Sequence, residues 1–425
     1  VLLVVDGVRL NNAIYRSGHL QNAITIDPNS IERVEVIYGS SSVGYGSDAL
    51  GGVVHYYTKT PKINNEKRFN SEISSRYASA QKALNYHLET EVSFNKWASY
   101  TSVSFSNFGD VRMGKNRQHG YEDWGLVPNY SANTETAFFV GPSVNPNPNI
   151  QKNSGYSQWD ILQKVAVTLP MESQFLLNIH YSTSSNIPRF DKLNEYRNGS
   201  LRFAEWNYGP QGRLLISPQL KLFPKKRFLY KGTVTTAFQQ VEESRIQRRF
   251  NSLNRETQQE KVKVYSINGD FEFAKRGVSS FAYGFELIRN NISSRAISHG
   301  LVVENGTVIG LQNPQPIPSR YPSGGSVYST AALYGNYRLD INPKTTFALG
   351  TRYTATRLEA SWEEQALIDS RLNRVDAKND ALTGSLSLSY RPQKPWRMSL
   401  LFSSGFRAPN VDDLGKIREN NGTIL

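Results

Sequence analysis

The sequence predicts an all-β membrane barrel, built as an antiparallel meander and preceded by part of a small α/β domain. Three observations support this: segments that alternate apolar and polar residues, short turns that alternate with long polar loops, and many aromatic residues. The 425 residues include 23 Tyr and 20 Phe but 3 Met, which suits aromatic girdles at membrane interfaces. A soluble all-β protein also uses aromatic residues, so composition alone leaves both classes open.

Alternation with a period of two marks strands that have one apolar and one polar face. It is clear in residues 86–94, 265–273 and 382–390. No run approaches the roughly 18 apolar residues of a membrane-spanning helix. We expect the apolar faces to contact lipid and the polar faces to line a lumen. The expected outward residues include Leu88, Val92, Leu386 and Leu388, and the expected inward residues include Glu89, Glu91, Ser385 and Ser387.

The connections between the expected strands have two lengths. Short turns rich in Pro, Lys and Gly alternate with long polar loops around residues 109–156, 185–209, 295–325 and 363–379. This asymmetry is typical of outer-membrane barrels. We count about 13 strands between residues 69 and 407. An odd number of strands in an open sheet leaves unpaired edges, and Val1 already stands inside a strand-like pattern, so we expect a segment of a longer protein.

The composition limits the function classes. There is no Cys, which excludes disulfides and thiolate metal sites. The net charge is +13, but Lys and Arg are scattered, which favours lipid headgroups or an anionic ligand over nucleic acid. No nucleophile elbow, phosphate loop or Ser/His/Asp arrangement is present. We therefore expect no catalytic residues, no enzymatic activity, no resident cofactor and no nucleic-acid partner.

The first 60 residues carry a family resemblance. The segments Ile31–Gly39 (IERVEVIYG) and Tyr45–Val54 (YGSDALGGVV), with Asp6-Gly7 upstream, resemble the plug domain of TonB-dependent outer-membrane receptors. The resemblance implies a plug within residues 1–62 and a barrel over 63–425, with the N-terminal part of the plug and the C-terminal strands missing. About 13 of an expected 22 strands would be present. The expected plug core is Ile31, Val34, Val36, Val53 and Val54, and Gly46, Gly51 and Gly52 are expected to permit turns and close backbone approach.

Two further matches concern ligand binding. Ser17-Gly18-His19-Leu20 resembles a plug-apex segment of haem receptors, so His19 is the candidate axial ligand of haem iron, with Tyr15 and Arg16 beside it. Ser404–Pro409 (SGFRAP) resembles a mid-barrel motif of the same receptors and makes Arg407 a candidate ligand contact. The second His that those receptors place after this motif is absent as far as Leu425. The sequence therefore leaves haem, siderophore and cobalamin open.

The resemblance implies active import of a scarce nutrient, an iron chelate or haem, across the Gram-negative outer membrane. The implied partners are the TonB–ExbB–ExbD complex, which contacts a segment upstream of Val1, outer-membrane lipid and lipopolysaccharide, the nutrient, and in some members a surface lipoprotein. Alternatives are import of cobalamin or another ligand, or a passive porin or adhesin barrel. A plug argues against the passive porin, because passive pores lack one.

Overall fold

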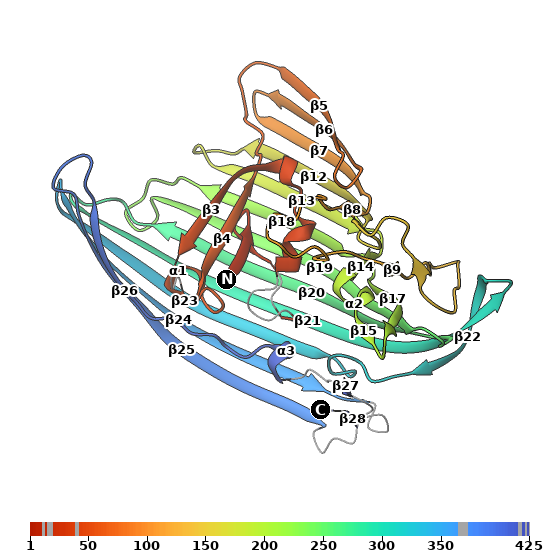
Figure 1. Cartoon of the computed structure of the whole chain (residues 1–425). Helices are drawn as coiled ribbons and strands as arrows, with labels where there is room; N and C mark the ends of the chain where they lie inside the picture. Colours follow the sequence, from red (N-terminus) through yellow and green to blue (C-terminus); the bar gives the residue numbers. More distant parts are fainter. Residues whose placement is uncertain are drawn as a thin grey trace.

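A computed structural model describes residues 1–10, 13–14, 20–38, 42–363, 373–414, 419–420 and 423–424. A small N-terminal sheet lies against the concave side of one large curved sheet (Figure 1). Within the described residues, no helix is both long and apolar enough to cross a membrane.

The N-terminal sheet has four strands in the order β2-β1-β4-β3. Strands β1 and β4 are parallel, and the other two pairs are antiparallel. Its apolar clusters bury Leu2, Val4 and Val53 on one face and Leu3 and Val5 on the other. The elements of this part are β1 (Leu2–Val5), β2 (Val8–Arg9), η1 (Leu20–Thr25), η2 (Pro28–Ser30), β3 (Ile31–Tyr38), α1 (Ser42–Tyr45) and β4 (Gly52–Thr58).

Two expectations about this unit are wrong in part. Val53 is buried and Ile31 packs against a buried cluster, but Val34 and Val36 are 45% and 51% exposed. They share a sheet face with Val54, but β3 is the edge strand and they lie beyond the cluster.

The second expectation, about the three glycines, holds for two of them. Gly46 and Gly52 have positive φ, and a Cβ at either would lie 2.8 Å from Arg352 or 2.5 Å from the Ile37 carbonyl. A Cβ at Gly51 would meet nothing closer than 3.9 Å. Space requires glycine at the first two positions, so the expectation is wrong for Gly51.

The large sheet follows the predicted meander. Thirteen strands are paired in sequence order, each antiparallel to its neighbours. Within the described chain the sheet stays open, with β5 and β26 at its edges. The strands are β5 (Arg68–Ala78), β6 (Ala83–Phe94), β7 (Trp97–Phe108), β12 (Tyr156–Thr168), β13 (Gln174–Ser184), β18 (Gly212–Leu222), β19 (Lys231–Arg249), β20 (Asn254–Glu272), β21 (Ser279–Glu304), β23 (Ser326–Asn342), β24 (Thr345–Ser361), β25 (Arg374–Tyr390) and β26 (Met398–Ser403).

The long connections gather at one end of the sheet, and they contain more structure than expected. The sequence predicts a loop over residues 295–325, but β21 continues to Glu304 and forms a hairpin with β22. The hairpin forms because Asn305-Gly306 adopt positive φ, the conformation of tight two-residue turns. The smaller elements are β8 (Val111–Arg112), β9 (Asn129–Tyr130), β10 (Ser143–Val144), β11 (Ile150–Gln151), β14 (Ile187–Pro188), α2 (Phe190–Leu193), β15 (Tyr196–Arg197), β16 (Ser200–Leu201), β17 (Phe203–Tyr208), β22 (Thr307–Pro316), α3 (Val411–Leu414), β27 (Glu419–Asn420) and β28 (Thr423–Ile424).

The two faces of the large sheet separate as the alternation predicts. Leu88, Leu386 and Leu388 are 42–44% exposed on the convex face. Glu89 and Glu91 point the other way and bond to the segment that follows β4, through Lys59 and the Lys62 amide. The alternation places Val92 with the first set and Ser385 and Ser387 with the second.

Candidate functional site

The candidate site is the contact between the N-terminal unit and the inner wall of the large sheet. Among the described residues, four groups of polar side chains contribute to this contact. One centres on Asp6, one on Arg9 and Glu286, one on Asp27 and one on Tyr321. Each joins residues that are distant in the sequence.

The Asp6-Gly7 turn between β1 and β2 is held by the barrel strands β12, β13 and β18, the last through Gln219 Nε2, which donates to the Asp6 carbonyl at 2.6 Å. One Asp6 oxygen lies 3.1 Å from Lys164 Nζ and 3.5 Å from His180 Nε2. The Thr58 hydroxyl and amide donate to the same carboxylate at 2.6 and 2.9 Å. Burial opposes ionisation of Asp6, but His180, Lys164 and Thr58 outweigh it and hold the pKa of Asp6 well below its usual range. The turn is therefore docked by a buried negative charge.

His55 of β4 supports the same turn. Its Nε2 accepts a hydrogen bond from the Gly7 amide at 3.0 Å. Burial lowers the pKa of His55, which favours the neutral imidazole that this bond requires. Through this hydrogen bond His55 contacts the backbone of the N-terminal unit.

The second group is a buried chain of four charges. Glu286 Oε1 of β21 lies 3.0 Å from Arg9 Nη1 and 2.7 Å from Arg352 Nη2 of β24. Arg9 Nη2 also lies 3.7 Å from Asp48 and donates to the Ser47 carbonyl. Burial disfavours the charge on Arg9, but Glu286 and Asp48 outweigh this and raise the pKa of Arg9. Because Arg352 passes close to Gly46, the glycine-containing segment lies against this chain of charges.

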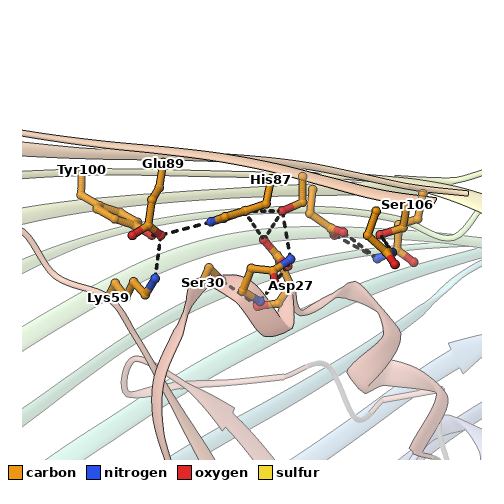
Figure 2. Close-up of polar contacts among 12 residues, drawn as sticks. Asp27, Ser30, Lys59, His87, Glu89, Tyr100 and Ser106 are labelled. Carbon is orange, nitrogen blue, oxygen red and sulfur yellow. Dashed lines mark hydrogen bonds and ion pairs between the residues drawn. The ribbon is translucent and has the colours of Figure 1, made fainter. Parts of the chain in front are cut away.

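The third group fixes η2 to β6 and β7 (Figure 2). Asp27 accepts from the Asn29 amide at 3.0 Å, which caps η2, and from Ser104 Oγ at 2.7 Å. Ser104 Oγ lies 2.7 Å from His87 Nδ1. Glu89 Oε2 completes the network and lies 3.1 Å from His87 Nε2, 2.6 Å from Lys59 Nζ and 2.7 Å from the Tyr100 hydroxyl.

The fourth group lies toward the long-loop end of the sheet. The Tyr321 hydroxyl is 2.7 Å from the Ile14 carbonyl and 2.8 Å from Asp412 Oδ1. Arg320 Nη2 lies 3.3 Å from the same Asp412 oxygen. Ile14, Tyr321 and Val411 share one buried apolar cluster. Asp412 is buried, and its carboxylate bonds to Tyr321 and Arg320.

The predicted ligand residues fall into two groups. Tyr15, Arg16 and His19 lie outside the described residues, so their placement stays a prediction. Arg407 is described, and its guanidinium is paired with Asp413. The next residue, Ala408, donates its amide to Ser47 Oγ at 3.1 Å. The motif around Arg407 therefore contacts the N-terminal unit directly.

Sequence reasoning missed Lys164, Glu286 and Arg352 as contact residues. Each interrupts the inward face of a strand with a full charge, and each is at least partly buried. The sequence signal that could have identified them is a long charged residue at an inward-facing position of a strand whose other inward-facing residues are small and polar. Across the parts of the chain that are described, no group of three or more His, Asp or Glu could hold a metal ion.

A plug-like unit held inside a curved antiparallel sheet defines a class of barrel with an obstructed lumen. Residues 1–53 match the family described as TonB-dependent Receptor Plug Domain. Residues 104–423 match the family described as TonB dependent receptor-like, beta-barrel. The chain belongs to the TonB-dependent receptor family, whose members are outer-membrane receptors and transporters. The N-terminal unit is called the plug below.

Relatives in this family differ in the ligand they are named for. The chain is 47% identical over 58 residues to a Hemin receptor of Yersinia enterocolitica, an alignment that covers 14% of this chain and 8% of the relative. It is 31% identical over 202 residues to the Vitamin B12 transporter BtuB of Vibrio vulnificus, covering 43% and 32%.

Among solved structures, the copper transporter OprC superposes with a TM-score of 0.72 at 11% identity. That match covers 97% of this chain and 56% of OprC, so the chain spans about half the length of that transporter. At this identity the match concerns the fold.

Proposed function

We propose that the protein imports a scarce nutrient, an iron chelate or haem, across the Gram-negative outer membrane. The observation that carries the proposal is the docking of the plug to the barrel wall by buried polar contacts. Polar groups can exchange these contacts for water when the plug moves, whereas a large apolar interface would resist hydration. A plug held in this way closes the lumen at rest and permits release.

A polar space beside the plug supports the same function. A cavity of about 680 Å³ lies between the plug and strands β12 to β23. Asp6, Arg9 and His55 border it from the plug, and Lys221 and Asp270 border it from the wall. A space lined by polar groups at this position gives a solute a route that opens further when the plug shifts.

The energy source follows from the proposed mechanism. A plug docked by several buried contacts needs applied force for release, which we assign to the TonB–ExbB–ExbD complex acting on the full-length receptor. We place the boundary between plug and barrel at residues 62 and 63. We assign no covalent chemistry and no resident cofactor to the protein. Cobalamin import, with the same plug and barrel, is the alternative that the BtuB relative favours.

The test is uptake by cells that carry the full-length receptor gene or lack it. Accumulation of labelled haem, ferric siderophore and cobalamin is measured in strains with and without a functional TonB gene. One ligand is expected to accumulate only when both receptor and TonB are present. Equal accumulation without TonB would support a passive pore and contradict the proposal.

The ligand itself is tested by haem titration of the full-length receptor. If Tyr15, Arg16, His19 and Arg407 contribute to a haem site, His19→Ala is expected to weaken binding at least tenfold and to shift the Soret band. His55→Ala is the control, because His55 bonds to the backbone of the plug. An unchanged spectrum and affinity in His19→Ala would remove the haem-ligand role and leave the import function open.

A further inference from the structure

His87 of β6 is a buried histidine between two carboxylates, at the contact of η2 with the barrel wall (Figure 2). Its Nε2 lies 3.1 Å from Glu89 Oε2, and its Nδ1 lies 4.0 Å from Asp27 Oδ2. Ser104 Oγ bridges the second gap, at 2.7 Å from His87 Nδ1 and 2.7 Å from Asp27 Oδ2. The side chain of His87 is 7% exposed, so its hydrogen bonds are made with protein groups.

The single proton of the Ser104 hydroxyl decides the state of Nδ1. An ionised carboxylate only accepts hydrogen bonds, so Ser104 donates its proton to Asp27. Ser104 Oγ must then accept from Nδ1 of His87. Asn29 Nδ2, at 3.4 Å, also donates to this oxygen, which agrees with its role as an acceptor. Nδ1 of His87 therefore carries a proton.

The other ring nitrogen faces a carboxylate that already accepts from two donors. Glu89 Oε2 lies 2.6 Å from Lys59 Nζ and 2.7 Å from the Tyr100 hydroxyl. Both donors favour the ionised form of Glu89, so its oxygen accepts a hydrogen bond from His87 Nε2 as well. Two donating ring nitrogens are the property of the imidazolium ion. A neutral ring has one proton and would leave one of these contacts without a hydrogen.

The carboxylates that face His87 also favour the protonated ring. Asp27 faces it from η2 and Glu89 from its own strand. Two more lie on neighbouring strands, because Glu72 of β5 stands beside Glu89 and Asp160 of β12 follows beyond β7. A proton on the ring reduces the repulsion among these negative charges.

The cations nearby do not balance this charge. Lys59, in the segment after β4, pairs with Glu89. Arg76 is exposed on β5, and Lys164 of β12 is paired with Asp6. Among the described residues, the charged groups that contact the ring or its partners directly carry one excess negative charge, which the imidazolium form neutralises.

We propose that His87 is a pH-sensitive latch, which docks η2 of the plug to the barrel wall when its ring is protonated. The charged ring supplies two hydrogen bonds, one to Glu89 and one that reaches Asp27 through Ser104. Because the docked state requires this second proton and the undocked state does not, docking is complete at acidic pH and weakens as the pH rises. Imidazole groups change charge near neutral pH. The latch therefore makes docking depend on the acidity of the surroundings.

The consequence is local to one corner of the plug. The other three groups of contacts remain, so the plug as a whole stays docked while η2 is released. The inference goes beyond the proposed function, because it concerns how the plug is held and applies to any imported nutrient.

The test is hydrogen–deuterium exchange of the purified full-length receptor, read at the amides of Asn29 and Ser30. Both amides bond to Asp27, the first to its side chain and the second to its carbonyl. His87→Gln is compared with the wild type at pH 6 and at pH 8, and the ratio of the two rates at one pH cancels the direct effect of pH on exchange. The variant should exchange at least fivefold faster at pH 6 and like the wild type at pH 8.

Glu89→Gln separates the latch from a merely structural role of His87. The Gln amide can donate to Nε2, so one proton on Nδ1 completes the network. This variant should exchange like the wild type at pH 6 and at least fivefold more slowly than the wild type at pH 8. The control is His119→Gln, because His119 lies in the loop after β8 and bonds to the Tyr121 amide. It should match the wild type at both pH values.

Two outcomes would overturn the proposal. One is a ratio between His87→Gln and the wild type that is the same at pH 6 and pH 8, and the other is a Glu89→Gln receptor that exchanges like the wild type at pH 8. If His87→Gln does not assemble, the comparison of Glu89→Gln with the wild type decides. Exchange is measured without nutrient or TonB, so its failure is separate from a failure of the uptake experiment.

Discussion

The inner and outer faces of the same strands make different kinds of contact. On β21 the inward Glu286 is buried between two guanidinium groups, and the next residue, Leu287, is 49% exposed on the lipid side. The inner face carries charges that meet partners from the plug. The outer face carries apolar side chains that meet partners only in a membrane. One residue of register separates a docking contact from a lipid contact.

Mutations on the two faces are therefore expected to have different consequences. A buried charge that loses its partner is destabilising because its desolvation is no longer compensated. A charge introduced on the lipid face is destabilising because the membrane offers no solvation. The first defect should loosen the plug in an assembled barrel, whereas the second should reduce assembly of the barrel itself.

The largest effect is expected from Glu286→Gln. It leaves Arg352 buried without a counter-charge and leaves Arg9 with only Asp48 at 3.7 Å, at a cost of about 3–5 kcal/mol. Limited proteolysis and thermal unfolding of the purified receptor should show a loosened plug within a folded barrel. Glu272→Gln, in an exposed pair with Lys231, is the control and should cost less than about 1 kcal/mol. Equal effects of the two substitutions would contradict the docking role of Glu286.

The next effect concerns the outer face. Leu386→Arg places a cation on the lipid side and should cost roughly 2–4 kcal/mol near the bilayer middle. Heat-modifiable barrel in isolated outer membranes should decrease. Ser387→Arg, one residue along the same strand, points into the lumen and should leave the yield unchanged. Equal yields from both variants would show that the assigned register is wrong.

A pH effect of about 2 kcal/mol is expected at Asp6, typical of a buried hydrogen-bonded charge. The pKa of Asp6 is depressed in the folded receptor. Its stabilising contribution is therefore complete above the ordinary aspartate pKa of about 4 and is lost as pH falls through the lower folded value. Protease resistance of the plug should be constant between pH 5 and 7 and decrease below pH 4. In the Asp6→Asn variant the plug should be less resistant to protease at neutral pH. Unchanged resistance there would contradict the stabilising contribution of Asp6.

The smallest effect is expected at Glu35 on the exposed edge of the plug. Glu35 pairs with Arg33 and accepts from the Tyr57 hydroxyl, but both charged side chains are about half exposed. Water screens such a pair, so Glu35→Gln should leave the unfolding midpoint of the receptor unchanged within error. A clear destabilisation would show that this edge is covered in the full-length receptor.

The strands of the barrel could be predicted because alternation is a local property. The segment 265–273 places Tyr265 and Ile267 on one face and Asn268 and Asp270 on the other, and β20 follows this pattern. The plug could be identified because its signature segments are also local features, each a short run of neighbouring residues. The hairpin of β21 and β22 was missed, although the Asn305-Gly306 turn between the apolar runs 301–303 and 308–309 is a strong hairpin signal.

The plug contacts could not be predicted because they depend on distances between remote residues. Asp6 and Lys164 are 158 positions apart, and no local pattern relates them. Val34 and Val36 fit a core pattern, yet they lie on an edge strand whose covering depends on the whole assembly. The ligand role of His19 rests on a resemblance and remains a prediction.

The central claim is that the plug leaves the barrel wall during import. Because the chain has no Cys, a disulfide between Asp27→Cys and Ser104→Cys can tether η2 to β7, where the two native side chains meet at 2.7 Å. Ser93→Cys/Ala98→Cys joins two paired wall positions and leaves the plug free. With the nutrient identified by the uptake experiment, the oxidised plug tether should abolish accumulation and reduction should restore it, while the wall pair has no effect. Full accumulation with an intact plug tether would contradict the claim.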